Sequence, residues 1–460
     1  MYGPGLLTSR TKLCLLPLVA AFACLLAVPG VSAAADPVPG TAIEPGEPYV
    51  PGELIVQYRG DAEPETLEVG DDVNVEAFAE ALEGRPAVVH ATPNYVARIS
   101  SWLPNDPGVN PRNPGQRGGW QLKQWNFLPC RSLCHPGASS GHQSLGGINA
   151  IRAWRELRKA GRPGARGVRV AVVDTGVAYR DYGRKYRRDP DLARRTFLRG
   201  RDFVDNDRVP LDRNGHGTHV SSTIAQATNN NRGLTGIAYG ARLIPVRVMD
   251  ANGYGSTEHI IKGIRWAANH GARVISMSIN FGCGVKIPAL EDVLAYAHRK
   301  GAVLVGSDGN KRAQSCPSLP ATAPQVISVG GTTESGCVGN YTFRSATVDL
   351  AAPGGGSTTS GCPDRTGNRS ILQVGMVGRN PAWFGIEPGW KGTSMAAAHV
   401  SAGAAMVIAS DVLKNGKGPR QVQERLLETA RLPDYARNDP KSGFGAGIMD
   451  LGKAVNPDIP

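Results

Sequence analysis

From residue 148 onward, short runs of Val, Ile and Leu alternate with stretches in which apolar residues recur every three to four positions. Continuous apolar runs are typical of strands buried on both faces, so the pattern predicts a mostly parallel central sheet with helices on both faces. The predicted strands are 168–173, 241–248, 274–279, 302–305, 326–329 and 348–351. The predicted helices are 148–159, one that begins near 216, 256–269, 289–300, and one from 394 to about 415. We therefore expect one large α/β domain.

A different pattern occupies residues 45–100. Residues 53–58 alternate like a strand, 75–82 have helical spacing, and 87–90 are strand-like again. This order predicts a small α+β unit, which follows a linker rich in Pro, Gly and Ala at 36–50. A unit of this size buries little apolar surface, so we expect it to need a partner for stability.

The first 35 residues have the composition of a secretory signal. Arg10 and Lys12 precede an apolar run over 13–28, and three alanines at 33–35 offer cleavage positions. An alternative is a lipoprotein that is acylated at Cys24. The bulky Phe22, two positions earlier, disfavours this alternative. The apolar run is short for a membrane span. We expect a secreted protein that leaves the membrane once the signal is removed.

Charge is distributed unevenly along the chain. Residues 1–35 carry +2 and residues 36–100 carry −10, which leaves +20 on residues 101–460 of the total of +12. A basic domain favours binding to anionic polymers or cell surfaces. Its positive charge also complements the negative charge of the acidic segment that precedes it. The sequence contains no basic patch interleaved with aromatic residues and no zinc-finger spacing, so we expect no nucleic-acid partner.

Six of the eight cysteines remain after the signal. An even number in an exported chain favours disulfides, and no histidine accompanies them at a zinc spacing. Fifteen pairings are possible in principle. We prefer neighbours, namely Cys130–Cys134, Cys283–Cys316 and Cys337–Cys362. The second pair has the best physical case, because each of its cysteines follows a predicted strand of the parallel sheet.

Three segments carry reactive side chains at strand C-terminal ends or helix N-termini, which is where such a sheet binds ligands. Asp174 follows the strand at 168–173, His216 lies between glycines at a helix start, and Ser394 opens an Ala-rich helix. Singly, each has a structural interpretation: an acid in a turn, a helix entry or half of a metal pair with His219, and an N-cap serine. Together they are the three residue types of a serine hydrolase, because the serine needs a base to take its proton and the base needs an acid to orient it.

The sequences around these residues resemble the three signature motifs of subtilisin-like serine proteases. The motifs are Asp174-Thr175-Gly176, His216-Gly217-Thr218-His219-Val220 and Gly392-Thr393-Ser394-Met395-Ala396, and with the intervening strands the resemblance covers roughly 150–455. It implies a serine endopeptidase in which Asp174 orients the base, His216 is the general base and then acid, and Ser394 is the acylated nucleophile. It also implies Asn310 and the backbone N–H of Ser394 as oxyanion donors.

The resemblance also implies substrate-binding segments and a structural metal ion. One segment pairs with the substrate backbone, and the other lies beside Asn310; together they comprise Ser278, Ile279, Asn280, Ser307, Asp308 and Gly309. An Asn-rich loop at 229–234 resembles a calcium-binding loop, and oxygen-only ligands suit Ca²⁺. Its implied ligands are Gln124, Asp191, Thr228, Asn230, Arg232 and Leu234. A second acidic run, Asp205, Asp207 and Asp212, is an alternative calcium site or a solvated loop.

The acidic unit resembles the family's inhibitory propeptide, which templates folding and is then removed by the protease itself. This gives a signal peptide at 1–35, a propeptide at 36–103 and a mature domain at 104–460, with the cut expected within 98–106. We expect polypeptide substrates, the chain's own propeptide as an intramolecular inhibitor, and a monomer. Asp308 departs from the family's small apolar residue and puts the substrate preference in question.

Two other functions fit parts of the sequence. A catalytically inactive homologue would serve as a basic extracellular binding or adhesion protein, but the complete set of catalytic residue types argues against it. A serine hydrolase of another kind, such as an esterase or transacylase, would have no protease activity to restrain, so the propeptide-like segment argues against it.

Overall fold

The computed structural model describes residues 49–70, 73–95, 102–109, 119–130, 144–311, 316–359, 362, 368–413, 416–437, 439 and 441–459. The chain divides into two compact units, Met1–Ser100 and Ser101–Pro460. The signal-like residues and Cys134 lie outside the described residues. None of the helices in the described ranges is both long and apolar enough to cross a bilayer.

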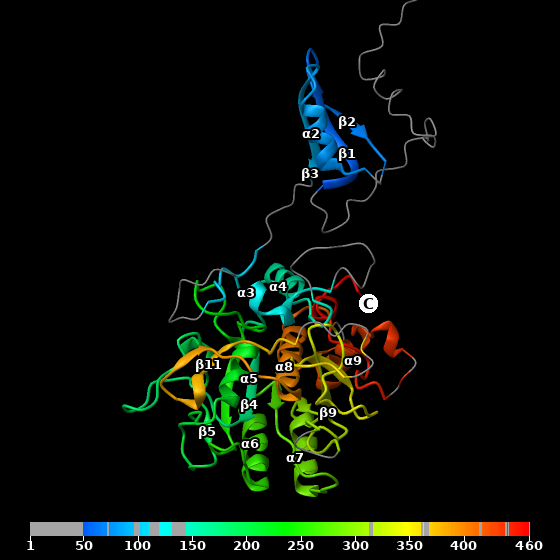
Figure 1. Ribbon diagram of the computed structural model, residues 1–460. Helices are drawn as coiled ribbons and strands as arrows, with labels where there is room; N and C mark the ends of the chain where they lie inside the picture. The colour runs from blue at the N-terminus through cyan, green and yellow to red at the C-terminus, as the bar shows by residue number, and fades with distance from the viewer. Residues whose placement is uncertain are drawn as a thin grey trace, which may run out of the picture. The chain divides into compact units, whose positions relative to one another are not determined.

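The first unit is a three-stranded antiparallel sheet with one helix (Figure 1). Its strand order is β2-β1-β3, and its core is formed by apolar residues of β1, β3 and the helix. The N-cap Asn74 starts the helix, because its side chain accepts a hydrogen bond from the N–H of Ala77. The elements are β1 (Tyr49–Tyr58), β2 (Glu65–Glu68), α2 (Val75–Glu83) and β3 (Val88–Tyr95). This matches the predicted small α+β fold.

The second unit is built on a seven-stranded sheet in which all neighbouring strands are parallel. Its order is β10-β9-β8-β7-β4-β6-β5, which places β4 and β7 near the middle. The strands are β4 (Arg169–Asp174), β5 (Arg201–Asp202), β6 (Arg242–Arg247), β7 (Val274–Met277), β8 (Val303–Ser307), β9 (Val326–Thr332) and β10 (Leu350–Pro353). The predicted parallel sheet is confirmed.

Helices cover both faces of this sheet (Figure 1). Along β4, Val170 and Val172 belong to one apolar cluster, whereas Ala171 and Val173 belong to the other. This alternation explains the unbroken apolar run in the sequence. The first cluster includes α4 (Ala150–Lys159), α5 (His216–Ala225), α8 (Thr393–Ala409) and α9 (Pro419–Glu428), and the second includes α6 (Thr257–Asn269) and α7 (Pro288–Arg299).

Several smaller elements were not expected from the sequence. They include strands β2 and β5, the hairpin of β11 (Val374–Met376) and β12 (Phe384–Ile386), the short helices α3 (Trp120–Lys123) and α10 (Leu451–Ala454), and α9. Several expected boundaries differ from the structure, including the end of β9, which extends to Thr332 rather than to 329. The strand expected at 348–351 starts at Leu350, where regular pairing with β9 begins. The helix expected to reach about 415 ends at Ala409, because Ser410 adopts an extended conformation.

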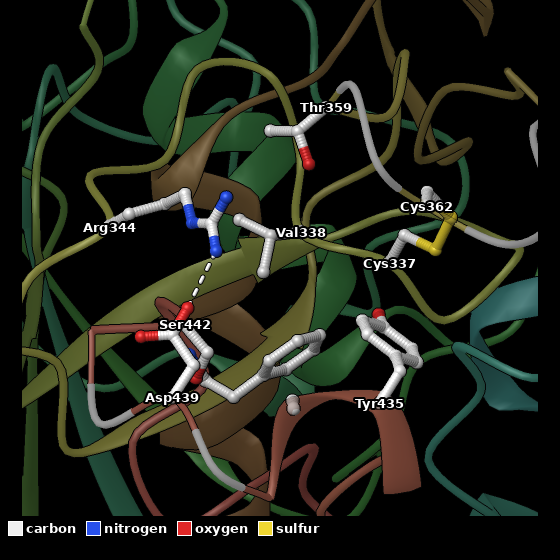
Figure 2. A pocket seen from close by; sticks show the side chains of 10 residues that line it. Cys337, Val338, Arg344, Thr359, Cys362, Tyr435, Asp439 and Ser442 are labelled. Atoms are coloured by element: carbon white, nitrogen blue, oxygen red, sulfur yellow. Dashed lines mark hydrogen bonds and ion pairs between the residues drawn. A yellow bond between two sulfur atoms is a disulfide. The ribbon is translucent and has the colours of Figure 1, made fainter.

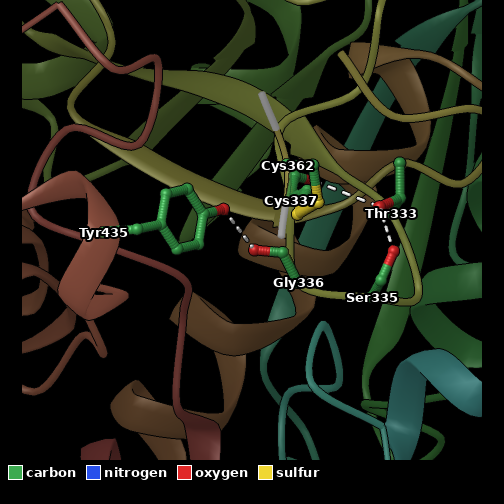
Figure 3. The surroundings of a disulfide bond; sticks show 6 residues. All are labelled: Thr333, Ser335, Gly336, Cys337, Cys362 and Tyr435. Carbon is green, nitrogen blue, oxygen red and sulfur yellow. Dashed lines mark hydrogen bonds between the residues drawn. A yellow bond between two sulfur atoms is a disulfide. The ribbon is translucent and has the colours of Figure 1, made fainter. Parts of the chain in front are cut away.

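Two disulfides join loops of the second unit, as predicted. Cys283–Cys316 links the segments after the neighbouring strands β7 and β8, with 5.4 Å between the Cα atoms. Cys337–Cys362 has a Cα separation of 5.9 Å (Figure 3). It borders a cavity of about 210 Å³ that also contains the ion pair of Arg344 and Asp439, at 2.7 Å (Figure 2). The predicted pair of Cys130 with Cys134 stays a prediction.

A cluster of aromatic rings anchors α4 to the rest of the second unit. The Trp154 side chain is fully buried, and its indole N–H donates to the Ile237 carbonyl at 2.7 Å. Its ring makes edge contacts with the rings of Trp102, Trp120 and Phe127. Since these partners come from two segments, 102–109 and 119–130, Trp154 joins the start of the unit to the helical layer.

We expect Trp154→Ala to lower the free energy of unfolding by about 3–5 kcal/mol, because it leaves a large cavity and an unpaired carbonyl. Denaturant unfolding followed by circular dichroism measures the change. The neighbouring exposed Arg155→Ala is the control, with an expected change within about 0.5 kcal/mol. A loss below about 1 kcal/mol for Trp154→Ala would contradict this account of the cluster.

Candidate active site

The carboxyl end of β4 and the first turn of α5 bring an acid and an imidazole together. Asp174 is the last residue of β4 and is 1% exposed, and His216 is the first residue of α5. The two side chains are hydrogen-bonded, with 2.8 Å between His216 Nδ1 and Asp174 Oδ1. The same carboxylate oxygen accepts the N–H of Thr175 at 2.7 Å. The predicted acid and base are therefore in direct contact.

Glycine permits this close approach. A Cβ atom on Gly217 would lie 2.2 Å from the carbonyl oxygen of Gly176 and 3.1 Å from Asp174 Oδ1. Any larger residue would separate β4 from α5. The glycines in these two sequence motifs thus have a steric role, in addition to the chemistry of the residues beside them.

A second buried acid, Asp212, holds the loop that leads into His216. Its Oδ1 atom accepts the N–H groups of Asn214 and Gly215 and the hydroxyl of Thr175. Its Oδ2 atom accepts both the N–H and the hydroxyl of Thr218. Asp212 therefore ties the residue after Asp174 to the loop before His216 and to the helix after it. The sequence interpretation had placed it only in an acidic run.

Ser394 is the accessible residue of an otherwise buried helix. All other residues of α8 are buried, and no charged residue occurs between Thr393 and Ala409. The carbonyl of Ser394 accepts the hydroxyl of Ser278 at 3.2 Å, which ties the start of α8 to the end of β7. On the other side, the ring of Trp390 lies 6.0 Å from the ring of His216. The segment entering α8 is therefore beside the imidazole.

Asn310 lies beside the same helix start. Its amide oxygen accepts the N–H of Thr393 at 3.2 Å and the Thr393 hydroxyl at 3.4 Å. The Thr393 hydroxyl also donates to the Gly309 carbonyl at 3.2 Å. Because these contacts hold the oxygen of the amide, they leave its NH₂ group as the donor, and the described residues supply it no acceptor. Thr393 is a positioning residue that the sequence interpretation did not single out.

Comparisons with known proteins agree with this geometry. The profile of the subtilase family matches residues 165–447. A thermophilic serine proteinase from Bacillus sp. (strain AK1) is 30% identical over 407 residues, which cover 83% of this chain and 82% of the relative. The chain belongs to the subtilase family. It is a serine endopeptidase with the α/β fold of subtilisins.

Two further relatives support the assignment of this subtilase. A solved structure of a protease from Pseudoalteromonas arctica has a TM-score of 0.54 and 27% identity, and the match covers 67% of this chain and 94% of that one. A protein of Xanthomonas campestris pv. campestris named extracellular protease is 30% identical over 352 residues, covering 68% of this chain and 54% of the relative. The alternative of an inactive binding protein is not favoured.

The two histidines of the second motif have different environments in this subtilase. Burial alone would lower the pKa of His216, but the charge and hydrogen bond of Asp174 and the charge of Asp212 raise that pKa above its usual value. His219 is buried against Trp390, its Nε2 atom lies 3.1 Å from the Ile371 carbonyl, and burial lowers its pKa to about 3. His216 pairs with a carboxylate, so the metal-pair alternative with His219 is not supported.

The two segments implied for substrate binding are joined in the subtilase structure. The Asn280 amide donates to the Ser307 carbonyl at 2.7 Å, and the Ser307 hydroxyl donates to the Asn280 amide oxygen at 3.1 Å. Ser278 and Ile279 precede this junction, and the Ile279 side chain is 2% exposed within the apolar core. Gly309 has a φ of +112°, which favours glycine before Asn310.

The loop implied for calcium is surrounded by oxygen atoms. Asp191 accepts the Asn230 amide at 2.9 Å and the N–H of Leu234 at 3.0 Å. Asp106, which the sequence interpretation missed, accepts the N–H groups of Asn229 and Asn230. Burial, with Asp106 adding a like charge, raises the pKa of Asp191 to about 7. The buried carboxylates of Asp106 and Asp191 are oxygen donors of the kind that Ca²⁺ prefers, and N–H groups of the loop occupy them in this structure.

Other residues of the two proposed metal sites are engaged differently. Gln124 pairs with the backbone N–H and carbonyl of Thr235 and is fully buried. The second acidic run is dispersed: Asp205 pairs with Arg247 and Arg213, whereas Asp212 serves the histidine loop. Among the residues that the structure describes, no three His, Cys, Asp or Glu side chains gather as a metal-binding group.

Asp308 is fully buried, so its side chain does not reach a substrate. Its Oδ1 atom accepts the hydroxyls of Ser328 at 3.2 Å and Thr347 at 3.1 Å. Its Oδ2 atom has no hydrogen-bond partner in the described structure. Burial raises the pKa of Asp308 to about 6, with a smaller contribution from the charge of Asp349. Any effect of this residue on the substrate would pass through the loop that carries Asn310.

The raised pKa of Asp308 predicts that the free energy of unfolding depends on pH. Between about pH 4 and 6 the folded state retains a proton that the unfolded chain has released, so stability falls as the pH rises through this window. Asp308→Asn removes this titration, and we expect its stability relative to wild type to increase from pH 4.5 to pH 8, by up to about 3 kcal/mol. Denaturant unfolding in a Ser394→Ala background avoids self-digestion.

The variant Asp292→Asn, which alters an exposed acid of α7, is the control. It should show a difference from wild type that does not change with pH. Titrations shared with wild type cancel in each difference. A pH-independent difference for Asp308→Asn would show that its carboxyl does not titrate in this window.

Proposed function

We propose that this subtilase hydrolyses polypeptides through an acyl-enzyme on Ser394, with His216 as the general base and Asp174 as its orienting acid. The observation that carries this proposal is the 2.8 Å hydrogen bond between His216 Nδ1 and Asp174 Oδ1. With the proton on Nδ1, Nε2 is the basic nitrogen of the neutral ring. A base with this tautomer can take the proton of a serine hydroxyl.

The reaction follows from these roles. Ser394 Oγ attacks the carbonyl carbon of the scissile peptide bond while His216 Nε2 takes its proton. The C–N bond of the tetrahedral intermediate then breaks, and His216 gives the proton to the leaving amine. Water, deprotonated by His216, attacks the acyl-enzyme and releases the second product. Asp174 stabilises the imidazolium formed in each half of the cycle.

Asn310 and the N–H of Ser394 are proposed to bind the oxyanion of the tetrahedral intermediate. The contacts of Thr393 to the Asn310 amide oxygen support this role, because they fix the amide before the substrate arrives. A preorganised donor costs no reorientation when the negative charge develops. The N-terminal end of α8 adds a favourable dipole at the same position.

Secretion and self-processing are also part of the proposal. The signal-like residues 1–35, the disulfides and the relative named extracellular protease support export. The compact acidic unit that ends near Ser100 supports a propeptide that inhibits the enzyme until it is cut off. Trp102 packs against Trp154 and Tyr239 in the second unit. We therefore propose that the cut lies before Trp102, at the start of the expected window.

We expect Ser394→Ala to leave the precursor uncut and to reduce peptide hydrolysis by roughly 10⁶-fold, since it removes the nucleophile. Asn310→Ala should reduce hydrolysis by about 10²–10³-fold and slow processing, because it removes one oxyanion donor only. The full chain is purified, and processing is followed by gel electrophoresis and N-terminal sequencing.

The control is Asp292→Asn, which alters an exposed acid of α7 outside the proposed site. It should process like wild type. Complete processing of pure Ser394→Ala without added protease would rule out this serine as the nucleophile for the cut. Wild-type precursor that stays intact in the same test would contradict self-processing.

A structural calcium ion is proposed at the loop that contains Asn230. Asp106 and Asp191 supply carboxylates, Asn230 supplies an amide oxygen, and Thr228, Arg232 and Leu234 would supply backbone carbonyls. The revised set includes Asp106, whereas the Gln124 side chain is occupied by Thr235. When bound, the ion would balance two buried negative charges and join the start of the second unit to the loop.

Chelation of calcium should lower the melting temperature by roughly 5 °C if the ion is present at about 100 times its Kd. Differential scanning calorimetry of the Ser394→Ala chain, with and without EDTA, measures the shift. Asp191→Asn should abolish the response to calcium, whereas the exposed Asp292→Asn should retain it. An unchanged melting curve on chelation would remove the calcium site from this account.

A further inference from the structure

The segment between Asp174 and His216 contains a strongly basic hairpin. In the nine residues Arg180–Arg188, here called the basic hairpin, there are five cationic side chains and one acid, Asp181. The N–H and carbonyl groups of Tyr182 and Tyr186 pair reciprocally at 3.2 Å, which closes the hairpin. Arg184, Lys185 and Arg187 are exposed near its tip.

The basic hairpin is held by contacts at its base. The N–H of Arg188 donates to Asp181 Oδ1 at 2.8 Å, and the N–H of Asp189 donates to the Ala178 carbonyl at 2.9 Å. The N–H of Arg187 donates to the Pro381 carbonyl at 2.9 Å, so the hairpin rests on the β11–β12 side of the second unit (Figure 1). It is therefore a fixed element of this surface.

The same base lies beside the catalytic histidine. The N–H of Ala178 donates to the hydroxyl of Thr218, two residues after His216, at 3.0 Å. Arg213, three residues before His216, has its guanidinium 6.0 Å from the ring of Tyr186. The basic hairpin is thus joined to the segments on both sides of His216.

Its positive charge is poorly balanced within the protein. Arg187 donates to the Gly183 and Tyr186 carbonyls, Lys185 lies over the Tyr186 ring, and Arg180 lies over the Tyr182 ring. Asp181 is shared with Arg194, at 3.9 Å. The acids that follow, Asp189 and Asp191, are buried. The cations are therefore positioned on neutral groups, and their charge faces solvent.

We propose that the basic hairpin binds acidic residues of the polypeptide being cleaved, which gives this subtilase a preference for substrates with acidic residues near the scissile bond. The inference rests on the proposed function, because it assigns a substrate class to that same site. Screening limits such attraction to about 8–10 Å at physiological salt. Because the hairpin is linked to the segments on both sides of His216, we expect acidic residues that flank the scissile bond to meet its cations.

The test uses matched fluorogenic peptides with one neutral core and flanks of three Glu, three Gln or three Lys, placed before or after the cut. Wild type should cleave one Glu-flanked peptide about tenfold faster in kcat/KM than its Gln counterpart at low salt, mainly through KM. This ratio should approach one at high salt. The enzyme is the purified product of the full chain.

Arg184→Gln with Lys185→Gln should reduce the Glu-to-Gln ratio severalfold, and Arg184→Glu with Lys185→Glu should bring it to one or below. Both pairs should leave the Gln-flanked peptide within about twofold of wild type, since neither residue is in the catalytic machinery. Arg299→Gln with Lys300→Gln, exposed at the end of α7, is the matched control and should keep the wild-type ratio.

An equal rate for Glu and Gln flanks in wild type, or a ratio unchanged by the hairpin variants, would overturn the inference while leaving the proposed function intact. Failure to cleave any of the peptides would instead contradict the proposed function. If heparin or duplex DNA binds in a hairpin-dependent manner and acidic flanks have no effect, the surface is a polyanion site and the inference is wrong.

Discussion

The hydrogen bond between Asp174 and His216 determines much of the surrounding structure. It requires the end of a central strand to meet the start of a helix at a distance of 2.8 Å between side-chain atoms. Gly217 makes room for this approach, and Asp212 holds the histidine loop against the residue after Asp174. A buried acid that pairs with five groups thus fixes the orientation of an imidazole that it does not touch.

The proposed nucleophile, Ser394, is positioned by the burial of its helix. Helix α8 contains small and apolar side chains around its whole circumference, so it can lie in the core against the sheet. Ser394 is reached from outside because it occupies the first turn, where the helix meets the loop from Trp390. Since interiors are densely packed, the backbone that carries Ser394 has little freedom to move.

The parts of the site that the sequence could predict are those with local signals. The strand before Asp174, the glycines around His216 and the small residues around Ser394 each appear in adjacent positions, and so does Asn310 after its strand. Asp106 was missed because its partner Asn229 lies 123 residues away, and the sequence interpretation of Asp212 missed its hydrogen bond with Thr175, which lies 37 residues away. The hairpin of β11 and β12 was missed since each of its strands has only three residues, too few for a periodic pattern.

Asp308 shows that a sequence motif can locate a loop without giving the direction of each side chain in it. Its position in the loop of Asn310 suggested a side chain in the substrate pocket, whereas neighbouring residues of an extended segment face opposite sides. The structure directs the buried Asp308 side chain to the hydroxyls of Ser328 in β9 and of Thr347 in the loop before β10. Sequence alone gave the loop correctly, and the direction of one side chain within it required the packing of β9.

Raising the pH favours a neutral base but also ionises buried acids. The proposed base, His216, is neutral only above its raised pKa, and the buried Asp308 and Asp191 become charged as the pH rises through about 6 and about 7. A rise in pH that makes His216 neutral therefore also increases the free-energy cost of burying these two carboxylates. The apolar layers on both sheet faces and the two disulfides contribute stability that offsets this cost.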